Sequence, residues 1–281
     1  MDMQNYIDDL LTLAIAEDIG DGDHTSLAVI PPEAEGKMKL LVKEEGVIAG
    51  IEIAKQLFKR IDWCLEMEQL LQDGDRVKKG DIAFYITGRE RALLQAERLV
   101  LNIMQRMSGV ATQTAAYVEA LEGLKTQVLD TRKTTPGMRV LDKLAVKIGG
   151  GGNHRMGLFD MILLKDNHID FAGGIEQAIM KTREYLQSTG RKLAIEVEVR
   201  SLNDLKTVLR VGGVQRIMFD NFDLPATEEA VALVAGRYET ESSGGITLEN
   251  LRAYAECGVD FISVGALTHQ IKSLDLSLKA V

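Results

Sequence analysis

The chain has 281 residues, of which 46% are hydrophobic and 27% charged, and its formal net charge is −9. This composition is that of a folded globular protein, long enough for two domains or for one barrel with an appendage. The acidic balance argues against a general nucleic-acid binder, because phosphate backbones select broadly basic surfaces. Two cysteines are too few for a disulfide framework or a zinc cluster, and this favours a cytoplasmic protein.

The N-terminal segment and the hydropathy pattern predict no contact with a membrane. The first twenty residues carry acidic side chains where a signal peptide would carry Lys or Arg. No apolar run approaches the roughly 18 residues that a membrane-spanning helix needs. We therefore expect no membrane partner.

The first part of the chain is predicted to mix helices with strands. Apolar residues recur at helical spacing from Asp2 to Glu17, and the acidic stretch 18–26 indicates a turn. A long, densely apolar segment at about 89–121 predicts a helix that is buried on two sides. The other expected elements are strands at 36–43, 46–49, 63–69 and 82–87 and a helix at 50–61.

From Gln127 onward, short apolar strands alternate with helical patterns. The expected strands are 127–130, 161–165, 193–199, 216–221, 237–242 and 260–264, and the expected helices are 137–147, 173–188, 201–211, 225–235 and 247–257. Six β/α units in sequence predict parallel strands with helices outside, and the fitting α/β architecture is an incomplete, about six-stranded barrel. We place this barrel domain at 116–268 and a first domain at 1–115, which a C-terminal helix at 269–281 is expected to join.

The segment from Thr131 to His168 is a basic island in an acidic chain. It holds seven Lys or Arg and three Asp, a balance of 7 − 3 = +4, so the rest of the chain sums to −13. Four consecutive glycines, 149–152, allow the backbone to approach a bound group closely, while Arg and Lys supply cationic donors. A solvated surface loop is the alternative interpretation, but it explains neither the glycines nor the positions of the charges. We interpret the island as a pocket for a small polyanion.

Every predicted strand of the barrel ends in a polar residue or a glycine, where such barrels place their reactive face. After the early strands the residues are mostly cationic, which suits carboxylates. The next two strands carry Glu198 and Asp220, two carboxylates that suit either a ribose hydroxyl or a Mg²⁺ ion. Glu196 lies on the same strand face as Glu198, and one of the two can instead neutralise Lys133 or Lys165. The loops SSGGIT and SVGALTH offer backbone N–H groups that are suited to a phosphate.

Several motifs in fixed order resemble those of the quinolinate phosphoribosyltransferase family. They are TRKTTPG, GGGGNHR, LLKDNH, EVEV, FDNF, SSGGIT and SVGALTH, and the resemblance extends to Glu97-Arg98 and 108–112 in the long helix. It implies an N-terminal α/β sandwich domain followed by the incomplete barrel. It also implies a homodimer whose subunits share active sites, and it leaves open whether dimers assemble further.

By the same resemblance the chain is expected to transfer a phosphoribosyl group from phosphoribosyl pyrophosphate to quinolinate, with decarboxylation, in NAD biosynthesis. Lys133, Glu198 and Asp220 are implied as catalytic residues, and Glu198 and Asp220 as the carboxylates that serve Mg²⁺, directly or through water. The implied quinolinate ligands are Thr131, Arg132, His154, Arg155, Lys165 and, from the partner subunit, Arg106. The implied phosphoribosyl pyrophosphate ligands are Lys133, Glu198, Asp220, Ser243, Gly244, Gly245, Val264, Gly265, Ala266 and His269.

Three other functions compete with this one. A related pyrophosphorylase on the same scaffold would act on another heterocyclic acid, and activity on nicotinate would favour it. A Schiff-base lyase would use Lys133 or Lys165, and borohydride would trap its adduct. A non-catalytic sensor would bind a phosphate ligand without turnover.

Overall fold

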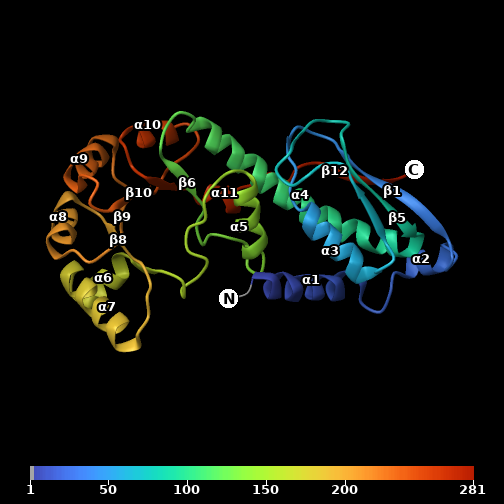
Figure 1. Ribbon diagram of the computed structural model, residues 1–281, viewed down its shortest axis with the longest axis horizontal. Helices are drawn as coiled ribbons and strands as arrows, with labels where there is room; N and C mark the ends of the chain where they lie inside the picture. The colour runs from blue at the N-terminus through green and yellow to red at the C-terminus, as the bar shows by residue number, and fades with distance from the viewer. Residues whose placement is uncertain (1–2) are drawn as a thin grey trace. The chain divides into compact units, whose positions relative to one another are not determined.

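The computed structural model describes residues 3–281, which form two compact units. The first unit contains residues up to 115 together with 134–150 and 267–281, and the second contains 116–133 and 151–266. Each unit has its own sheet (Figure 1).

The first unit is built on a four-stranded antiparallel sheet with the order β12-β1-β5-β3. Its strands are β1 (Glu35–Val42), β3 (Glu66–Gln69), β5 (Ile82–Arg89) and β12 (Leu276–Ala280). A separate two-stranded sheet pairs β2 (Gly46–Val47) with β4 (Arg76–Val77). The chain's last strand thus pairs with its first, through Met38 and Ala280 among others.

Helices supply most of the buried apolar residues of the first unit. They are α1 (Met3–Ile19), α2 (His24–Val29), α3 (Ile51–Ile61), α5 (Arg139–Ile148) and most of α4 (Glu90–Ala120), whose last turn belongs to the second unit. Phe58 of α3 meets Phe84 of β5 edge to face, with ring centroids 6.0 Å apart. Asp73 accepts a hydrogen bond from the Ile51 N–H at 2.8 Å and so caps α3.

Two local predictions for this unit are wrong. The expected C-terminal helix at 269–281 is instead the strand β12, because Leu276 and Leu278 are buried while Lys279 is exposed, which is the two-residue period of a strand. The expected turn at 18–26 contains the start of α2, whose N-terminus Asp23 caps by accepting the Ser26 N–H at 3.1 Å.

The second unit is a six-stranded parallel sheet with the order β6-β11-β10-β9-β8-β7, surrounded by helices (Figure 1). Its strands are β6 (Gln127–Leu129), β7 (Ile162–Leu164), β8 (Ile195–Val199), β9 (Arg216–Asp220), β10 (Glu239–Ser243) and β11 (Phe261–Ser263). Its helices are α6 (Asp166–Ala172), α7 (Ile175–Thr189), α8 (Leu202–Val211), α9 (Leu224–Val234) and α10 (Leu251–Glu256), and α11 (Ala266–His269) begins in this unit. The last strand of this unit, β11, pairs with its first, β6, whereas β6 and β7 do not pair in the described residues. The predicted incomplete barrel is therefore confirmed, and its open side lies between these two strands.

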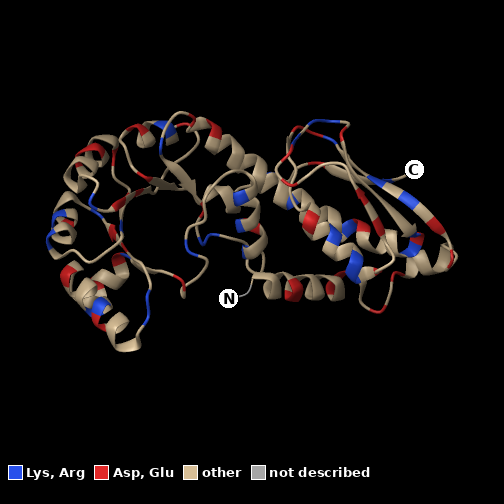
Figure 2. Cartoon of the chain, viewed as in Figure 1, with Lys and Arg blue, Asp and Glu red and all other residues tan. Residues whose placement is uncertain are grey.

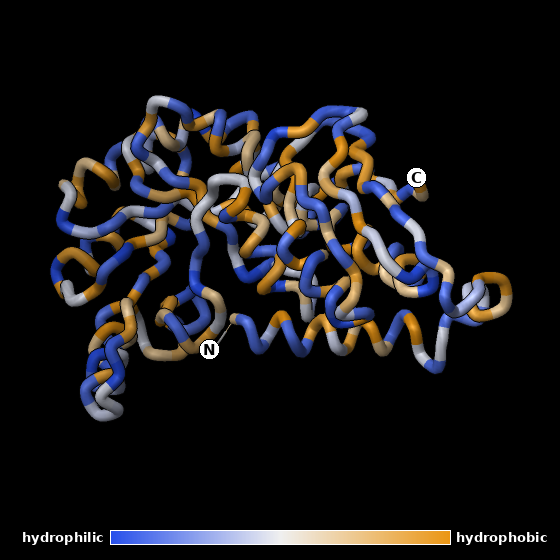
Figure 3. The backbone as a smooth tube through the Cα atoms, turned by 45° about the vertical axis from the view of Figure 1, so that its right-hand side comes forward, coloured by the Kyte–Doolittle hydropathy of each residue, from blue (hydrophilic) through white to orange (hydrophobic). Residues whose placement is uncertain are grey.

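Apolar residues in both units are interspersed with polar ones. Figure 3 shows hydrophobic and hydrophilic residues alternating along the tube rather than forming one long apolar segment. Within residues 3–281, every helix is too short or too polar to span a membrane.

Gly109 of α4 allows close packing against the segment that precedes β12. A Cβ atom at this position would collide with the Lys272 carbonyl oxygen and would come within 3.0 Å of Ser273 Cα. Alanine favours helices, but the methyl group of Gly109→Ala would meet the backbone of Lys272 and Ser273, which cannot move aside as a side chain can. We therefore expect Gly109→Ala to destabilise the protein by about 1–3 kcal/mol. Chemical unfolding measures this, with the exposed Asn102→Ala on the same helix as control; a more stable Gly109→Ala variant would contradict the close approach.

Candidate active site

Parallel pairing brings most of the predicted site residues to one edge of the second unit's sheet. Asp220, the last residue of β9, is in register with Ser243, the last residue of β10. Glu198 lies one residue before the end of β8, and Lys165 directly follows β7. Figure 2 shows acidic residues on β8 to β10 and basic residues on the loop after β6. Residues far apart in sequence thus share one edge.

Glu198 and Asp220 form a carboxylate pair beside one lysine. Lys165 Nζ lies 3.8 Å from Glu198 Oε2, and the Glu198 side chain is 9% exposed while that of Lys165 is 47% exposed. Burial raises the pKa of Glu198, and the nearby Asp220 carboxylate raises it further. Two oxygen donors whose charges repel one another fit Mg²⁺, which takes one or two carboxylates and completes its shell with water and phosphate.

The loop after β10 forms a narrow turn of glycines. Gly244 has φ +95° and Gly245 has φ +62°, conformations that favour glycine. A Cβ atom on Gly244 would collide with the side chain of Asn221. The backbone N–H of Asn221 donates to the Ser243 carbonyl at 2.8 Å. Asn250 Nδ2 donates to the Gly245 carbonyl at 3.2 Å and holds the loop from the other side. Nothing lies within 4 Å of the Cβ position of Gly245, so the loop is open there.

The predicted cationic residues fall into an exposed and a buried group. Arg132 and Lys133 are exposed on the loop after β6, where the Lys133 N–H donates to Thr131 Oγ1 at 3.0 Å. Arg155 is buried, and burial together with repulsion from Arg132 lowers its pKa. Its Nη1 donates to the Met161 carbonyl at 3.2 Å. Two arginines that repel each other favour an anion between or beside them.

The last glycine of the run lies beside β6. Gly152 forms a parallel bridge with Leu129. A larger side chain would not fit at this position, because a Cβ atom on Gly152 would lie 2.6 Å from Leu129 Cδ2. Asp130 then fixes the residues that follow. Its Oδ2 accepts from Asn153 Nδ2 at 2.6 Å and its Oδ1 from the His154 N–H at 2.9 Å.

His154 lies against two buried glutamates inside the barrel. Its Nε2 is 3.0 Å from Glu196 Oε2 and 3.6 Å from Glu241 Oε2. Arg216 Nη1 donates to Glu241 Oε2 at 3.1 Å and the Arg216 guanidinium lies over the Phe261 ring. Burial raises the pKa of Glu196 and of Glu241 to about 7, and the charge of Glu196 adds to the effect on Glu241. This acidic cluster is the inner layer of the barrel.

Arg106 and His269 belong to the first unit. Arg106 binds both oxygens of the buried Asp142 carboxylate, through Nε at 2.8 Å and Nη2 at 2.9 Å. The same Nη2 also donates to Thr135 Oγ1 at 2.9 Å and to the Thr268 carbonyl at 3.2 Å. His269 is the exposed last residue of α11.

Comparison with known proteins identifies the family. The model of the quinolinate phosphoribosyl transferase N-terminal domain matches residues 23–108, and that of the C-terminal domain matches 110–279. The chain belongs to this family. It is 45% identical to quinolinate phosphoribosyltransferase [decarboxylating] 1b of Nicotiana tabacum, with 96% of this chain and 81% of that protein covered. It is 42% identical to the probable nicotinate-nucleotide pyrophosphorylase [carboxylating] of Bacillus subtilis, with 96% and 91% covered.

The fold of this quinolinate phosphoribosyltransferase family member agrees with a solved structure of the same family. The crystal structure of NadC from Streptococcus pyogenes superposes with a TM-score of 0.92 at 40% identity, and the match covers 98% of this chain and 97% of that one. The predicted family and the predicted fold class are thus confirmed.

The predictions overlooked several carboxylates that hold the predicted residues of this family member in place. Asp130 directly precedes Thr131, so its position after a strand could have indicated it. Asp142 and Glu241 carry weaker signals. A single acid within a basic helix, or one of two alternating acids on a strand, is usually solvated, and only burial distinguishes these two.

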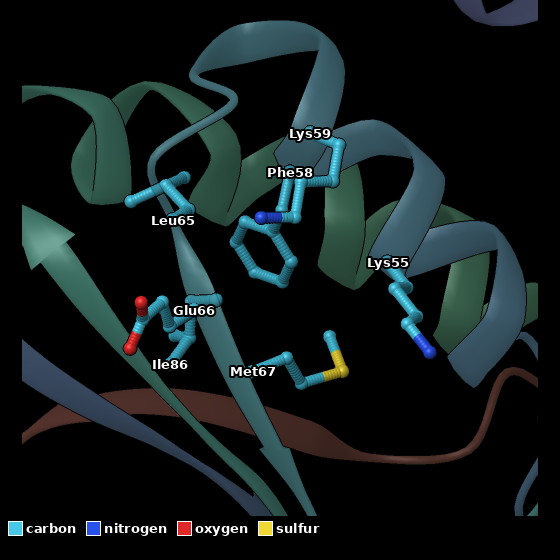
Figure 4. A pocket seen from close by; sticks show the side chains of 7 residues that line it. All are labelled: Lys55, Phe58, Lys59, Leu65, Glu66, Met67 and Ile86. Carbon is cyan, nitrogen blue, oxygen red and sulfur yellow. The ribbon is translucent and has the colours of Figure 1, made fainter.

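A pocket of about 350 Å³ lies in the first unit, and its lining contains none of the predicted site residues. In Figure 4, Phe58 projects from α3 toward Met67 of β3 and toward Leu65 just before that strand, with Lys59 beside it, while Lys55 lies to one side. The complete lining is Lys55, Phe58, Lys59, Leu65, Glu66, Met67 and Ile86. One of its lysines is already engaged, since Lys59 Nζ donates to the Trp63 carbonyl at 2.8 Å. The pocket therefore adds no residue to the predicted site.

The buried acids make stability depend on pH. The folded-state pKa of Glu241, about 7, lies above its ordinary value of 4.5, so the folded protein keeps this proton after the unfolded chain has released it. Stability of the wild type therefore falls as the pH rises from 4.5 to about 7. Glutamine cannot ionise, so the free energy of unfolding of Glu241→Gln lacks this loss. We expect the difference in free energy of unfolding between Glu241→Gln and wild type to grow in favour of the variant by on the order of 1–3 kcal/mol from pH 5 to pH 8.

Chemical unfolding of both proteins at the two pH values measures this gain. Glu184→Gln, which replaces an exposed carboxylate of α7, is the matched control and should show a difference near zero. An equal stability difference between Glu241→Gln and wild type at both pH values is incompatible with a proton held by the buried pair.

Proposed function

We propose that this chain transfers the phosphoribosyl group of phosphoribosyl pyrophosphate to quinolinate and releases CO₂, giving nicotinate mononucleotide and pyrophosphate in NAD biosynthesis. One observation carries the proposal. The strand-end edge of a family member places a cationic group of side chains next to a carboxylate pair and a glycine turn. The first group suits an aromatic dianion and the second suits an activated sugar phosphate.

The quinolinate side of the site is the cationic one. Arg155 offers a buried guanidinium, and Lys165 and Arg132 offer exposed charges after β7 and β6, the two edge strands of the sheet. Forked and point-like donors bind the two carboxylates of quinolinate, with Thr131 and His154 beside them. We expect the cations to concentrate on the 3-carboxylate, because a tightly held 2-carboxylate would resist leaving as CO₂.

The phosphoribosyl pyrophosphate side is the acidic and glycine-rich one. Glu198 and Asp220 would hold the magnesium that accompanies this substrate, and Lys133 would neutralise its pyrophosphate. When bound, Mg²⁺ supplies positive charge to the leaving group. Ser243 and its two following glycines present backbone N–H groups to the 5′-phosphate. The same phosphate contacts are proposed for Val264, Gly265, Ala266 and His269.

Positioning and charge neutralisation account for the chemistry without a covalent nucleophile. The quinolinate nitrogen attacks C1′ of the ribose as pyrophosphate leaves, and positive charge develops on the sugar ring in an oxocarbenium-like state. As carboxylates, Glu198 and Asp220 would stabilise that charge. The nitrogen then bears a positive charge next to C2, so the electrons left by departing CO₂ are stabilised, and a proton replaces the carboxylate.

The proposal includes a homodimer with shared active sites. Arg106 is the residue that would extend to the quinolinate site of the other subunit, and Asp142 fixes its guanidinium through two hydrogen bonds. We place the enzyme in the cytoplasm, because both cysteines are free thiols.

Incubation with quinolinate, phosphoribosyl pyrophosphate and Mg²⁺ tests the function. We expect equal amounts of nicotinate mononucleotide, pyrophosphate and CO₂, and loss of turnover when a chelator removes the metal. Chromatography of the nucleotide and trapping of labelled CO₂ give the measurement. Nicotinate accepted in place of quinolinate, with no CO₂ formed from quinolinate, would refute the proposed reaction.

Substitutions on the two sides of the site should separate the two substrates. We expect Lys165→Ala to raise KM for quinolinate tenfold or more, about 1.4 kcal/mol, because a carboxylate partner is lost. Gly244→Ala should raise KM for phosphoribosyl pyrophosphate by a similar factor, since the methyl group collides with Asn221 and deforms the glycine turn. Steady-state kinetics with each substrate varied measures both. Equal effects of each substitution on both KM values would contradict the division of the site.

A further inference from the structure

The side chain of His154, one of the predicted quinolinate ligands, lies against glutamates inside the barrel. It is 6% exposed, and its Nε2 lies 3.0 Å from Glu196 Oε2 on β8 and 3.6 Å from Glu241 Oε2 on β10. Its other nitrogen, Nδ1, accepts the backbone N–H of Arg155 at 2.7 Å. Both ring nitrogens therefore face protein groups.

These contacts determine which ring nitrogen carries the proton. An Nδ1 that accepts a hydrogen bond has its lone pair available and bears no proton, so the proton of the ring lies on Nε2. The Nε2 atom is buried and lies within 3.6 Å of both carboxylates without a hydrogen bond to either, so their negative charge stabilises the Nε2 proton through proximity alone. The tautomer thus follows from the Arg155 amide on one side and from Glu196 and Glu241 on the other.

The same tautomer argues against a metal ion at this cluster. His154, Glu196 and Glu241 offer ligand atoms that all lie within 4.8 Å of one another, a spacing that could hold a cation. A histidine that binds metal through Nε2 donates from Nδ1, whereas here Nδ1 accepts. Arg216 also occupies one Glu241 oxygen, at 3.1 Å, and already places a positive charge there.

We propose that His154 is a positioning residue that fixes the Arg155 backbone, and that Glu196 and Glu241 are the carboxylates that hold its ring in place. The proposal rests on the proposed function, in which the Arg155 guanidinium binds a quinolinate carboxylate. It replaces the role expected for His154, because the ring offers the substrate no donor.

A second anchor makes the role of the ring separable from folding of the segment. Asp130 accepts the His154 N–H at 2.9 Å and the Asn153 side chain at 2.6 Å. Both bonds are independent of the imidazole ring. A substitution at His154 therefore leaves the path of the backbone anchored and removes the contacts of the ring, to the Arg155 amide on one side and to the two glutamates on the other.

Asparagine and glutamine at position 154 test the proposal against direct substrate binding. The asparagine oxygen can take the place of Nδ1 and accept the Arg155 N–H, whereas the glutamine amide reaches the place of Nε2 instead. We expect His154→Asn to keep KM for quinolinate within about threefold of wild type and His154→Gln to raise it tenfold or more. KM for phosphoribosyl pyrophosphate should stay within about twofold in both. The exposed His24→Asn serves as the control that changes neither constant.

The ¹⁵N resonances of the wild-type imidazole rings separate positioning from direct substrate binding, because only a ring that binds quinolinate would change its protonation when quinolinate is added. The chain has only four histidines, and the signal absent from His154→Asn identifies this ring. We expect a protonated Nε2 and an unprotonated Nδ1, with the same tautomer after quinolinate is added.

The outcomes separate this inference from the function on which it rests. A glutamine variant close to wild type with an impaired asparagine variant, or an Nε2 signal that shifts to another protonation state on quinolinate binding, overturns the positioning role while turnover stands. A wild type that does not convert quinolinate overturns the proposed function and with it the substrate assigned to Arg155. In that case the tautomer measurement still tests the contact to the Arg155 amide.

Discussion

The parallel pairing of β8, β9 and β10 is the constraint on which the site depends. Registers such as Glu196 with Arg216 and Asp220 with Ser243 fix the height of each side chain along the barrel. Because side chains alternate between faces, a slip of one residue in any of these strands would turn its acids outward. The ladder hydrogen bonds between neighbouring strands therefore preserve the arrangement of charges at the strand ends.

The interior of this barrel differs from the usual packing of branched aliphatic residues. Glu196 and Glu241 are fully buried with Arg216 close by, an arrangement whose desolvation is costly even when charges are paired. Protonation near pH 7 relieves part of that cost. The positioning of His154 offers a reason to keep such groups, since functional sites commonly retain local arrangements that lower stability.

The two sides of the strand-end site solve different electrostatic problems. Arg155 is a buried cation that loses solvation and faces a second arginine, so a dianion between them relieves both effects. Glu198 and Asp220 repel one another, so a divalent cation relieves their repulsion. In the proposed function, each substrate or ion would complete a charge balance that the protein alone leaves uneven, which is how a preorganised site gains binding free energy.

The sequence by itself determined the elements, their parallel arrangement and most strand-end residues, because periodicity and motif order are local properties of the chain. It failed where distant residues decide the outcome. The segment ending in Ala280 became a strand because β1 offers it an edge, and the role of His154 emerged only when Glu196 and Glu241 met its ring. Burial decides whether Asp142 is a solvated acid or the partner of Arg106. Pairing and burial are properties of the tertiary structure, since they depend on contacts between residues that no local pattern relates.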